Sequence, residues 1–253
     1  MSLSFQSENS YKMKWWGWGA QNLRASLKDR PGVFPYLQKN LGLDKYEPVQ
    51  TFSLSEPRPP KSLLPQAIVD EFIQFLGEKK CFTDDLERVV HCYGKSYKDL
   101  VRIRNGIFEN VPDIVLYPAN DKDIKIIFDL CIKHRVSLTP FGGGTSVVGG
   151  VDCLKGDANY SCSVDLTSMK GLIRFDEKSQ IAEFEAGIFG PELEKILGEK
   201  GYTLGHFPQS FEFSTLGGWI AARSSGQNSI LYGGIEKLIQ SVKVLTPVGE
   251  IRL

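Results

Sequence analysis

The sequence contains no apolar stretch long enough to cross a membrane, because no run of about 18 apolar residues occurs in it. Residues 1–30 contain neither the apolar core of a signal peptide nor an Arg-rich amphipathic stretch. Lys and Arg together number 30, as do Asp and Glu, so no net charge draws the chain to nucleic acid or to an anionic membrane. We therefore expect no secretion, no membrane span and no nucleic-acid partner.

Cysteine and histidine are too scattered to indicate a metal site. The 5 cysteines form no C-x-x-C pair, and none of the 3 histidines stands at metal-ligand spacing from them. This pattern predicts no bound metal and free thiols in a reducing compartment, at Cys81, Cys92, Cys131, Cys153 and Cys162. Although Cys92 follows His91, neighbours on a regular element point in different directions. We expect packing at Cys92 and not a nucleophile with its base.

Glycine is concentrated where an apolar, strand-like run ends. Residues 139–150 read Thr-Pro-Phe-Gly-Gly-Gly-Thr-Ser-Val-Val-Gly-Gly. Glycine permits positive φ and has no Cβ, so successive N–H groups can converge on phosphate oxygens, and Thr145 and Ser146 add hydroxyl donors. No Lys follows the glycines, which excludes an NTPase loop, and no helical pattern follows, which excludes a G-x-G-x-x-G dinucleotide turn. We predict a flavin or another diphosphate ligand; the alternative is a flexible hairpin without a ligand.

A second segment of similar chemistry occupies residues 206–226. Hydroxyl groups at Ser210, Ser214 and Thr215 can donate to a phosphate or a flavin ring. The pair at 217–218 is Gly-Gly, which lets the backbone approach a ligand closely. We interpret this segment as a second wall of the ligand site. The alternative is a Ser-capped helix with a Gly-Gly packing contact.

Apolar spacing predicts an α+β fold with two small sheets and no long parallel sheet. Helices are expected at 64–77, 121–135, 190–200 and within 214–225. Strands are expected at 113–118, 136–140 and 161–166, with hairpins at 173–187 and 242–253. The first two strands and the helix between them form a β-α-β unit, which we expect to be right-handed. Residues 11–60 show little periodicity and predict an irregular arm anchored by buried tryptophans.

The glycine loop and the second segment together resemble the FAD-binding domain of the vanillyl-alcohol-oxidase-type flavoproteins. Within that group the chain is similar to the alkylglycerone-phosphate synthases, also called alkyl-dihydroxyacetonephosphate synthases. The stretches that carry this similarity are Met-Lys-Trp-Trp-Gly-Trp-Gly at 13–19, Val-Pro-Asp-Ile-Val-Leu-Tyr-Pro at 111–118, and Gly-His-Phe-Pro-Gln-Ser-Phe-Glu-Phe-Ser-Thr-Leu-Gly-Gly-Trp at 205–219. The resemblance implies a two-lobed FAD-binding domain at 107–253, preceded by an irregular or helical arm with helices at 1–106.

The resemblance also implies FAD contacts, which motif matching transfers to three groups of residues. The first group is expected to hold the diphosphate and the other two the ribityl and isoalloxazine portions. The groups are Pro140, Phe141, Gly142, Gly143, Gly144, Thr145 and Ser146; Gln209, Ser210, Phe211, Glu212, Phe213, Ser214 and Thr215; and Ala222, Arg223, Ser224 and Ser225. Gln209 stands where an acidic residue is common in the animal enzymes. The loop has no His or Cys to tie the flavin covalently, so non-covalent FAD is expected.

The implied activity exchanges the acyl chain of acyl-dihydroxyacetone phosphate for a fatty alcohol, an ether-lipid step without net redox. The family's substrate domain and catalytic groups are expected beyond Leu253, so no catalytic residue is assigned and the chain is expected to be a fragment. A membrane contact through the missing part and a homodimer are left open. The expected compartment is the cytoplasm in a bacterium and the peroxisome in a eukaryote.

Two other functions stay open at this point. One is an FAD-linked dehydrogenase or oxidase of 2-hydroxy acids such as D-lactate or glycolate, which shares the diphosphate loop. Such enzymes usually begin near the strand at 113–118 and have no tryptophan-rich arm. The other is an interaction module that has lost its flavin, against which the intact Gly and Ser/Thr positions of both segments argue.

Overall fold

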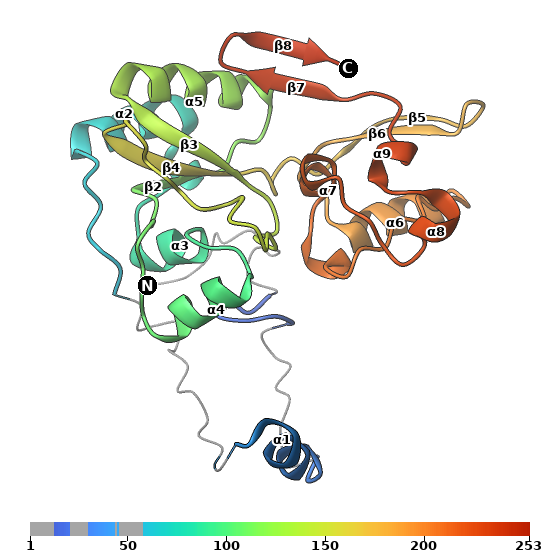
Figure 1. The fold of residues 1–253 in the computed structure, drawn as a ribbon. Helices are drawn as coiled ribbons and strands as arrows, with labels where there is room; N and C mark the ends of the chain where they lie inside the picture. The colour runs from blue at the N-terminus through green and yellow to red at the C-terminus, as the bar shows by residue number, and fades with distance from the viewer. Residues whose placement is uncertain (1–12, 21–29, 44, 46–57) are drawn as a thin grey trace.

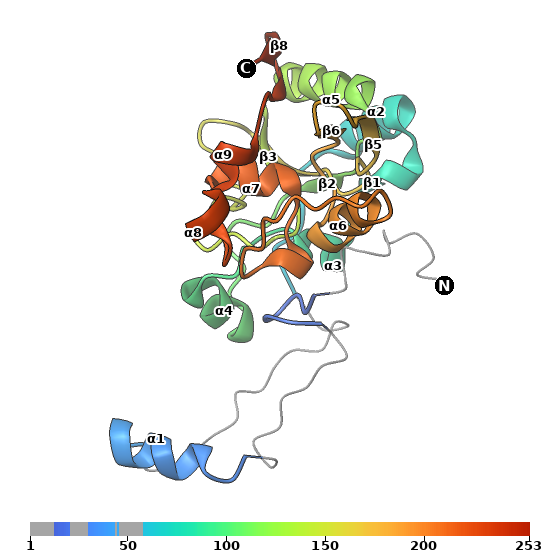
Figure 2. The same ribbon diagram turned by 90° about the vertical axis from the view of Figure 1, so that its right-hand side faces the viewer.

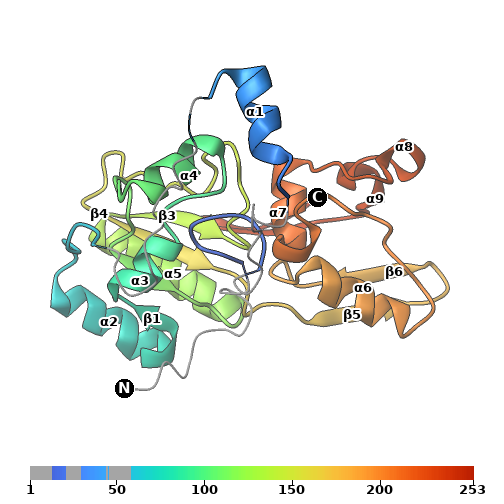
Figure 3. The same ribbon diagram turned by 90° about the horizontal axis from the view of Figure 1, so that it is seen from below.

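The computed structural model describes residues 13–20, 30–43, 45 and 58–253 of the chain. These residues form two lobes that lie side by side, as Figure 1 and the view from below in Figure 3 show. Helices and strands are mixed in both lobes, so the predicted α+β class is confirmed. No helix in the described ranges is both long and apolar enough to cross a membrane.

The first lobe is built on a four-stranded sheet with the order β1-β2-β4-β3, in which β1 is antiparallel and the other three strands are parallel. Its strands are β1 (Cys81–Phe82), β2 (Ile114–Leu116), β3 (Val136–Phe141) and β4 (Tyr160–Asp165). The expected β-α-β unit is present, but β4 lies between the two strands that the unit connects. Since β4 is buried along almost its whole length, it takes the central place that a strand covered on both faces requires.

Two helices, α2 (Gln66–Leu76) and α5 (Asp121–His134), cover one face of this sheet (Figure 1). Phe72 and Ile127 from these helices are fully buried, and the core that they share with the strands includes Ile114 and Val164. The Asn120 side chain accepts hydrogen bonds from the first N–H groups of α5, which explains where that helix begins. Both helices occur where apolar spacing predicts them.

The short helices α3 (Asp85–Val90) and α4 (Tyr97–Arg104) lie on the other side of the sheet, against the N-terminal arm (Figure 1). Trp15 is buried there among Val89, Tyr93 and Ile103, as the predicted anchoring requires, whereas Trp18 is 41% exposed. Residues 31–43 contain helix α1 (Val33–Leu41), which the periodicity of residues 11–60 did not indicate but which agrees with the irregular or helical arm that the resemblance implies. This helix has no buried residue and stands apart from both lobes in Figures 1 and 2. Residues 11–12, 21–29, 44 and 46–57 of the predicted arm lie outside the described residues.

The second lobe packs a hairpin and several short helices around Ile188, Leu193, Trp219 and Ile235. Its elements are β5 (Leu172–Asp176), β6 (Ile181–Phe184), α6 (Gly190–Gly198), the 3₁₀ turn η3 (Phe211–Phe213), α7 (Leu216–Ala222), α8 (Ser229–Tyr232) and α9 (Ile235–Leu238). Helix α7 lies within the range predicted for it, where Thr215 caps its start and Arg223 adopts a left-handed conformation at its end.

The terminal hairpin, β7 (Lys243–Thr246) and β8 (Gly249–Arg252), returns to the first lobe (Figure 1). The Lys243 ammonium there lies 2.6 Å from an Asp121 carboxylate oxygen at the start of α5. The described residues therefore form three sheets and not the two that we predicted. The division proposed between residues 106 and 107 stays a prediction.

Candidate functional site

The glycine loop begins where β3 ends, at the carboxyl edge of the parallel strands. Among the described residues, no oxygen accepts a hydrogen bond from the N–H groups of residues 142–146. The Ser146 hydroxyl oxygen accepts a hydrogen bond from the N–H of Gly150 at 3.0 Å, so the loop folds back on itself. The hydrogen of the Ser146 hydroxyl can still be donated to a ligand. Successive backbone N–H groups without a protein acceptor are the donor set that a diphosphate requires. This loop therefore fits the phosphates of FAD.

The second predicted segment meets this loop directly. A Cβ added at Gly142 would overlap the Thr215 hydroxyl, and one at Gly143 would overlap the carbonyl oxygen of Phe213. Two segments about 70 residues apart, one from each lobe, therefore touch where the glycines of the first segment have no side chain to separate them. The ligand site predicted from the sequence lies at the junction of the two lobes.

Hydroxyl groups in the second segment are partly occupied by the protein itself. The Ser214 hydroxyl accepts the Trp219 Nε1–H at 2.6 Å and donates to the Ser210 carbonyl at 2.8 Å. The Thr215 hydroxyl accepts the N–H of Gly218 at 3.4 Å and so caps α7. The capped helix that we gave as the alternative interpretation is therefore present, with Thr215 and not a serine as its cap. The side chains of Gln209 and Glu212 are exposed to solvent.

The third predicted group follows α7 and stays within the second lobe. Its Ser224 hydroxyl lies 2.6 Å from Nε2 of His206, whose ring packs against Trp219. Burial lowers the pKa of His206, which favours the neutral ring at physiological pH. The side chains of Ala222, Arg223 and Ser225 are exposed. Among the described residues, no hydrogen bond joins this group to the glycine loop.

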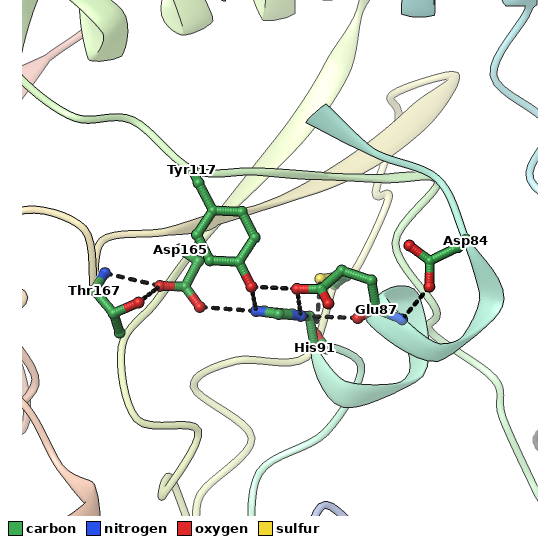
Figure 4. Close-up of polar contacts among 7 residues, drawn as sticks. Asp84, Glu87, His91, Tyr117, Asp165 and Thr167 are labelled. Atoms are coloured by element: carbon green, nitrogen blue, oxygen red, sulfur yellow. Dashed lines mark hydrogen bonds and ion pairs between the residues drawn. The ribbon is translucent and has the colours of Figure 1, made fainter. Parts of the chain in front are cut away.

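A buried network that the sequence did not point to adjoins Phe141, the residue that precedes the glycines of the loop. Figure 4 shows the polar contacts of this network. The His91 ring is fully buried, and its Nε2 lies 2.9 Å from the Asp165 carboxylate. On its other side Nδ1 lies 2.8 Å from the Glu87 carbonyl oxygen. The Tyr117 hydroxyl donates to the Glu87 carboxyl, and Thr167 donates to Asp165 through both its N–H and its hydroxyl.

The protonation of this network follows from its acceptors. Nδ1 of His91 faces the Glu87 carbonyl oxygen, which can only accept, so Nδ1 carries a hydrogen. When Nε2 donates to the ionised Asp165 carboxylate as well, the ring is an imidazolium. Burial by itself would lower the pKa of His91, but the hydrogen bond to Asp165 and the nearby Glu87 raise it. Burial raises the pKa of Glu87 as well. The one available sequence signal was Asp165, a charged residue that closes an otherwise uncharged buried strand.

A buried cation adjoins the far end of the loop. The Lys95 N–H donates to the Ser146 carbonyl at 2.6 Å, and the Lys95 ammonium donates to the Trp15 carbonyl at 3.2 Å. Lys95 is 4% exposed, and burial lowers its pKa to about 8. Within the described ranges no carboxylate pairs with this ammonium. A dianionic diphosphate on the loop would supply negative charge close to it.

The cysteines do not add chemistry to this site. Cys92 is fully buried in the cluster around Trp15, which confirms its packing role. Burial raises the pKa of Cys153 to about 12, so its thiol stays protonated at physiological pH. In the described part of the chain, no group of at least 3 His, Cys, Asp or Glu side chains could hold a metal ion.

Comparison with known proteins places these features in a family. The family described as "FAD binding domain" matches residues 112–253. Alkyldihydroxyacetonephosphate synthase of Trypanosoma brucei brucei is 40% identical over 211 residues, which cover 83% of this chain and 33% of that protein. The protein of the same name from Caenorhabditis elegans is 30% identical, over an alignment that covers 100% of this chain and 46% of that protein.

A solved structure of alkyldihydroxyacetonephosphate synthase has the same fold, with a TM-score of 0.85 and 31% identity over 96% of this chain and 49% of that chain. Glycolate oxidase subunit GlcD of Bacillus subtilis is more distant, at 24% identity over 75% of this chain. These similarities confirm the predicted resemblance, the two-lobed fold and FAD as the cofactor. The chain spans between a third and a half of the length of the relatives that it matches.

Proposed function

Because the chain belongs to the family of FAD binding domains, we propose that it is the cofactor-binding part of an alkylglycerone-phosphate synthase of ether-lipid synthesis. The observation that carries the proposal is the higher identity to the synthases than to a glycolate oxidase subunit over a similar share of the chain. The substrates proposed for the whole protein are acyl-dihydroxyacetone phosphate and a long-chain fatty alcohol.

The residues of this chain bind and orient the cofactor in this proposal. The N–H groups of residues 142–146 hold the diphosphate, and the Lys95 ammonium offsets its charge. The segment from Phe213 to Thr215 closes the site from the second lobe. When bound, FAD supplies a ring that can retain the substrate carbon while one chain is exchanged for another. Holding the ring in one place converts that exchange into a reaction between oriented groups.

Three features of the whole protein belong to the same proposal. Both lipid substrates have long chains, which favours a peripheral membrane contact through parts of the protein beyond this chain. A homodimer is compatible with the proposal, but the proposed activity does not depend on it. The proposed compartment is the cytoplasm for a bacterial protein and the peroxisome for a eukaryotic one.

The deciding experiment uses the full-length protein without oxygen. Palmitoyl-dihydroxyacetone phosphate is added while the flavin absorbance is followed, and hexadecanol is then added with mass-spectrometric detection of the ether product. The proposal expects the flavin spectrum to bleach and the ether lipid to form. Neither change should occur when dihydroxyacetone phosphate without its acyl chain replaces the substrate.

Two outcomes would reassign the protein. Bleaching by D-lactate or glycolate, with no response to the lipid, would indicate a 2-hydroxy-acid dehydrogenase or oxidase, the function of relatives at lower identity. Purified protein with no yellow chromophore and no affinity for added FAD would indicate an interaction module.

A further inference from the structure

Three parallel strands end in residues that touch the same buried histidine. Phe141 is the last residue of β3 and pairs in register with Asp165, the last residue of β4, while Tyr117 directly follows β2. His91 follows the short helix α3 and inserts its ring among them (Figure 4). Ligands of parallel sheets bind beyond the carboxyl ends of the strands. The His91 ring therefore lies on the side of the sheet where FAD binds.

A chain of direct contacts leads from this histidine to the glycine loop. The centroids of the His91 and Phe141 rings are 4.3 Å apart. A Cβ added at Gly144 would lie 2.6 Å from Cζ of Phe141, so this glycine rests on the ring. Gly144 has a φ of 65°, a left-handed conformation that glycine adopts without strain. The direction of the N–H groups in the loop thus depends on where the Phe141 ring lies.

The charge on His91 fixes its ring in turn. The groups that face it are the carboxyls of Glu87 and Asp165, the Tyr117 hydroxyl and the Cys153 thiol, which donates to the His91 carbonyl oxygen. A charge-assisted hydrogen bond to a carboxylate is stronger and shorter than one between neutral groups. As an imidazolium, His91 is therefore held from both sides.

We propose that the buried pair of His91 and Asp165 is a positioning element for FAD. The pair holds the Phe141 ring, and that ring holds Gly144 in the conformation in which the N–H groups of the loop can reach the diphosphate. The inference rests on FAD as the cofactor, and it is independent of which reaction the full protein catalyses.

The test compares wild-type protein with His91→Gln in the full-length protein. Removing the ring and its charge is expected to weaken FAD binding about tenfold, the lower end of the loss caused by removing a group that orients a ligand-holding residue. The loop amides to follow in FAD-free protein are those of Lys95 and Leu166, which donate to the carbonyls of Ser146 and Phe141 at the two ends of the loop. They are expected to exchange hydrogen faster in the variant, while the amides of α5 keep their protection. The control is His134→Gln, which removes another histidine–carboxylate pair, formed with Glu71 and only partly buried.

The pH dependence provides a separate test. Because the pKa of folded His91 is raised above its ordinary value of 6.5, its charge is complete below that pH and is lost as the pH rises through the folded value. Wild-type FAD affinity should decline over that rise. His91→Gln should show a smaller decline, which comes only from the loss of charge on Lys95, whose pKa is about 8. Asp165→Asn should shift the His91 part of the decline to lower pH, because the ring loses the carboxylate that raises its pKa.

Three outcomes decide the matter. Unchanged FAD affinity and unchanged loop exchange in His91→Gln would overturn the inference, as would a uniform rise of exchange in the loop and α5. If His91→Gln does not fold, Phe141→Leu replaces it, and unchanged FAD affinity and loop exchange in that variant would equally refute the inference. Failure of the wild type to bind FAD would refute the proposed function, while exchange of the loop amides in FAD-free protein would still test the role of His91.

Discussion

Gly143 lies so close to Phe213 that a Cβ at position 143 would overlap the carbonyl oxygen of Phe213. This contact brings the diphosphate loop of the first lobe against the wall supplied by the second. The separation of the lobes at the cofactor site is thus set by a residue without a side chain.

Replacing this glycine should damage both stability and cofactor binding. Gly143→Ala forces the carbonyl of Phe213 away, and overpacking of this kind costs about 1–3 kcal/mol of unfolding free energy. FAD affinity should fall together with the stability, because both walls of the site shift. Urea unfolding and flavin fluorescence titration measure the two effects.

The matched control is Gly198→Ala at the end of α6, where nothing lies within 4 Å of the added Cβ. That variant should keep FAD affinity and gain up to about 1 kcal/mol, since alanine restricts the unfolded chain. Equal behaviour of the two variants would contradict a tight contact at Gly143.

Lys95 is expected to lower the stability of the FAD-free protein and to raise its affinity for FAD. Lys95→Met removes a buried ammonium without a carboxylate partner, so the FAD-free variant should be more stable than wild type. It should also bind FAD several-fold more weakly, because the diphosphate loses a nearby positive charge. The exposed Lys98→Met serves as the control and should change neither.

The same substitution predicts a pH effect. The pKa of Lys95 is about 8 in the folded state and 10.5 ordinarily, so the folded state releases this proton first. Wild type should therefore gain stability relative to Lys95→Met as the pH rises from 8 to 10.5, by an amount on the order of 3 kcal/mol. A constant difference between the two proteins across this range, measured by urea unfolding, would show that Lys95 is not desolvated.

The tryptophans of the arm should differ sharply in their contributions. Trp15 is 4% exposed in the cluster with Val89 and Tyr93, so Trp15→Ala should cost about 3–5 kcal/mol of unfolding free energy. Trp18 is 41% exposed, and Trp18→Ala should stay within about 0.5 kcal/mol of wild type. Thermal and urea unfolding of the two variants measure this contrast, and similar losses would mean that Trp15 does not anchor the arm.

FAD is predicted to be held without a covalent bond. The raised pKa of Cys153, about 12, keeps its thiol protonated, and hydrogen bonds engage both ring nitrogens of His91. Neither side chain is therefore a nucleophile for the flavin. Acid precipitation should leave all flavin in the supernatant, whereas yellow colour in the washed pellet would contradict the prediction.

Most helices and strands, and the two segments rich in glycine and hydroxyl residues, could be recognised from the sequence, because the patterns that mark them are local. Helix α5 follows from apolar spacing and its Asn120 cap, and the loop at 142–146 from glycine next to hydroxyl residues. The reading of residues 11–60 as irregular did not point to helix α1, which is only 9 residues long and has no buried residue. The central place of β4 was missed as well, since the order of strands depends on pairing between distant residues.

The sequence by itself determined the family and the cofactor. The segments expected to contact FAD stay a prediction, which rests on the backbone freedom of glycine and on the hydroxyl donors that the sequence places there. Only the tertiary structure decided what supports those segments. His91 and Asp165 are 74 residues apart, and their ion pair exists only where β4 ends beside α3. Lys95 and Ser146 likewise meet only after folding. Such contacts depend on chain topology, because no local pattern records which distant residue will fill the space next to a buried charge.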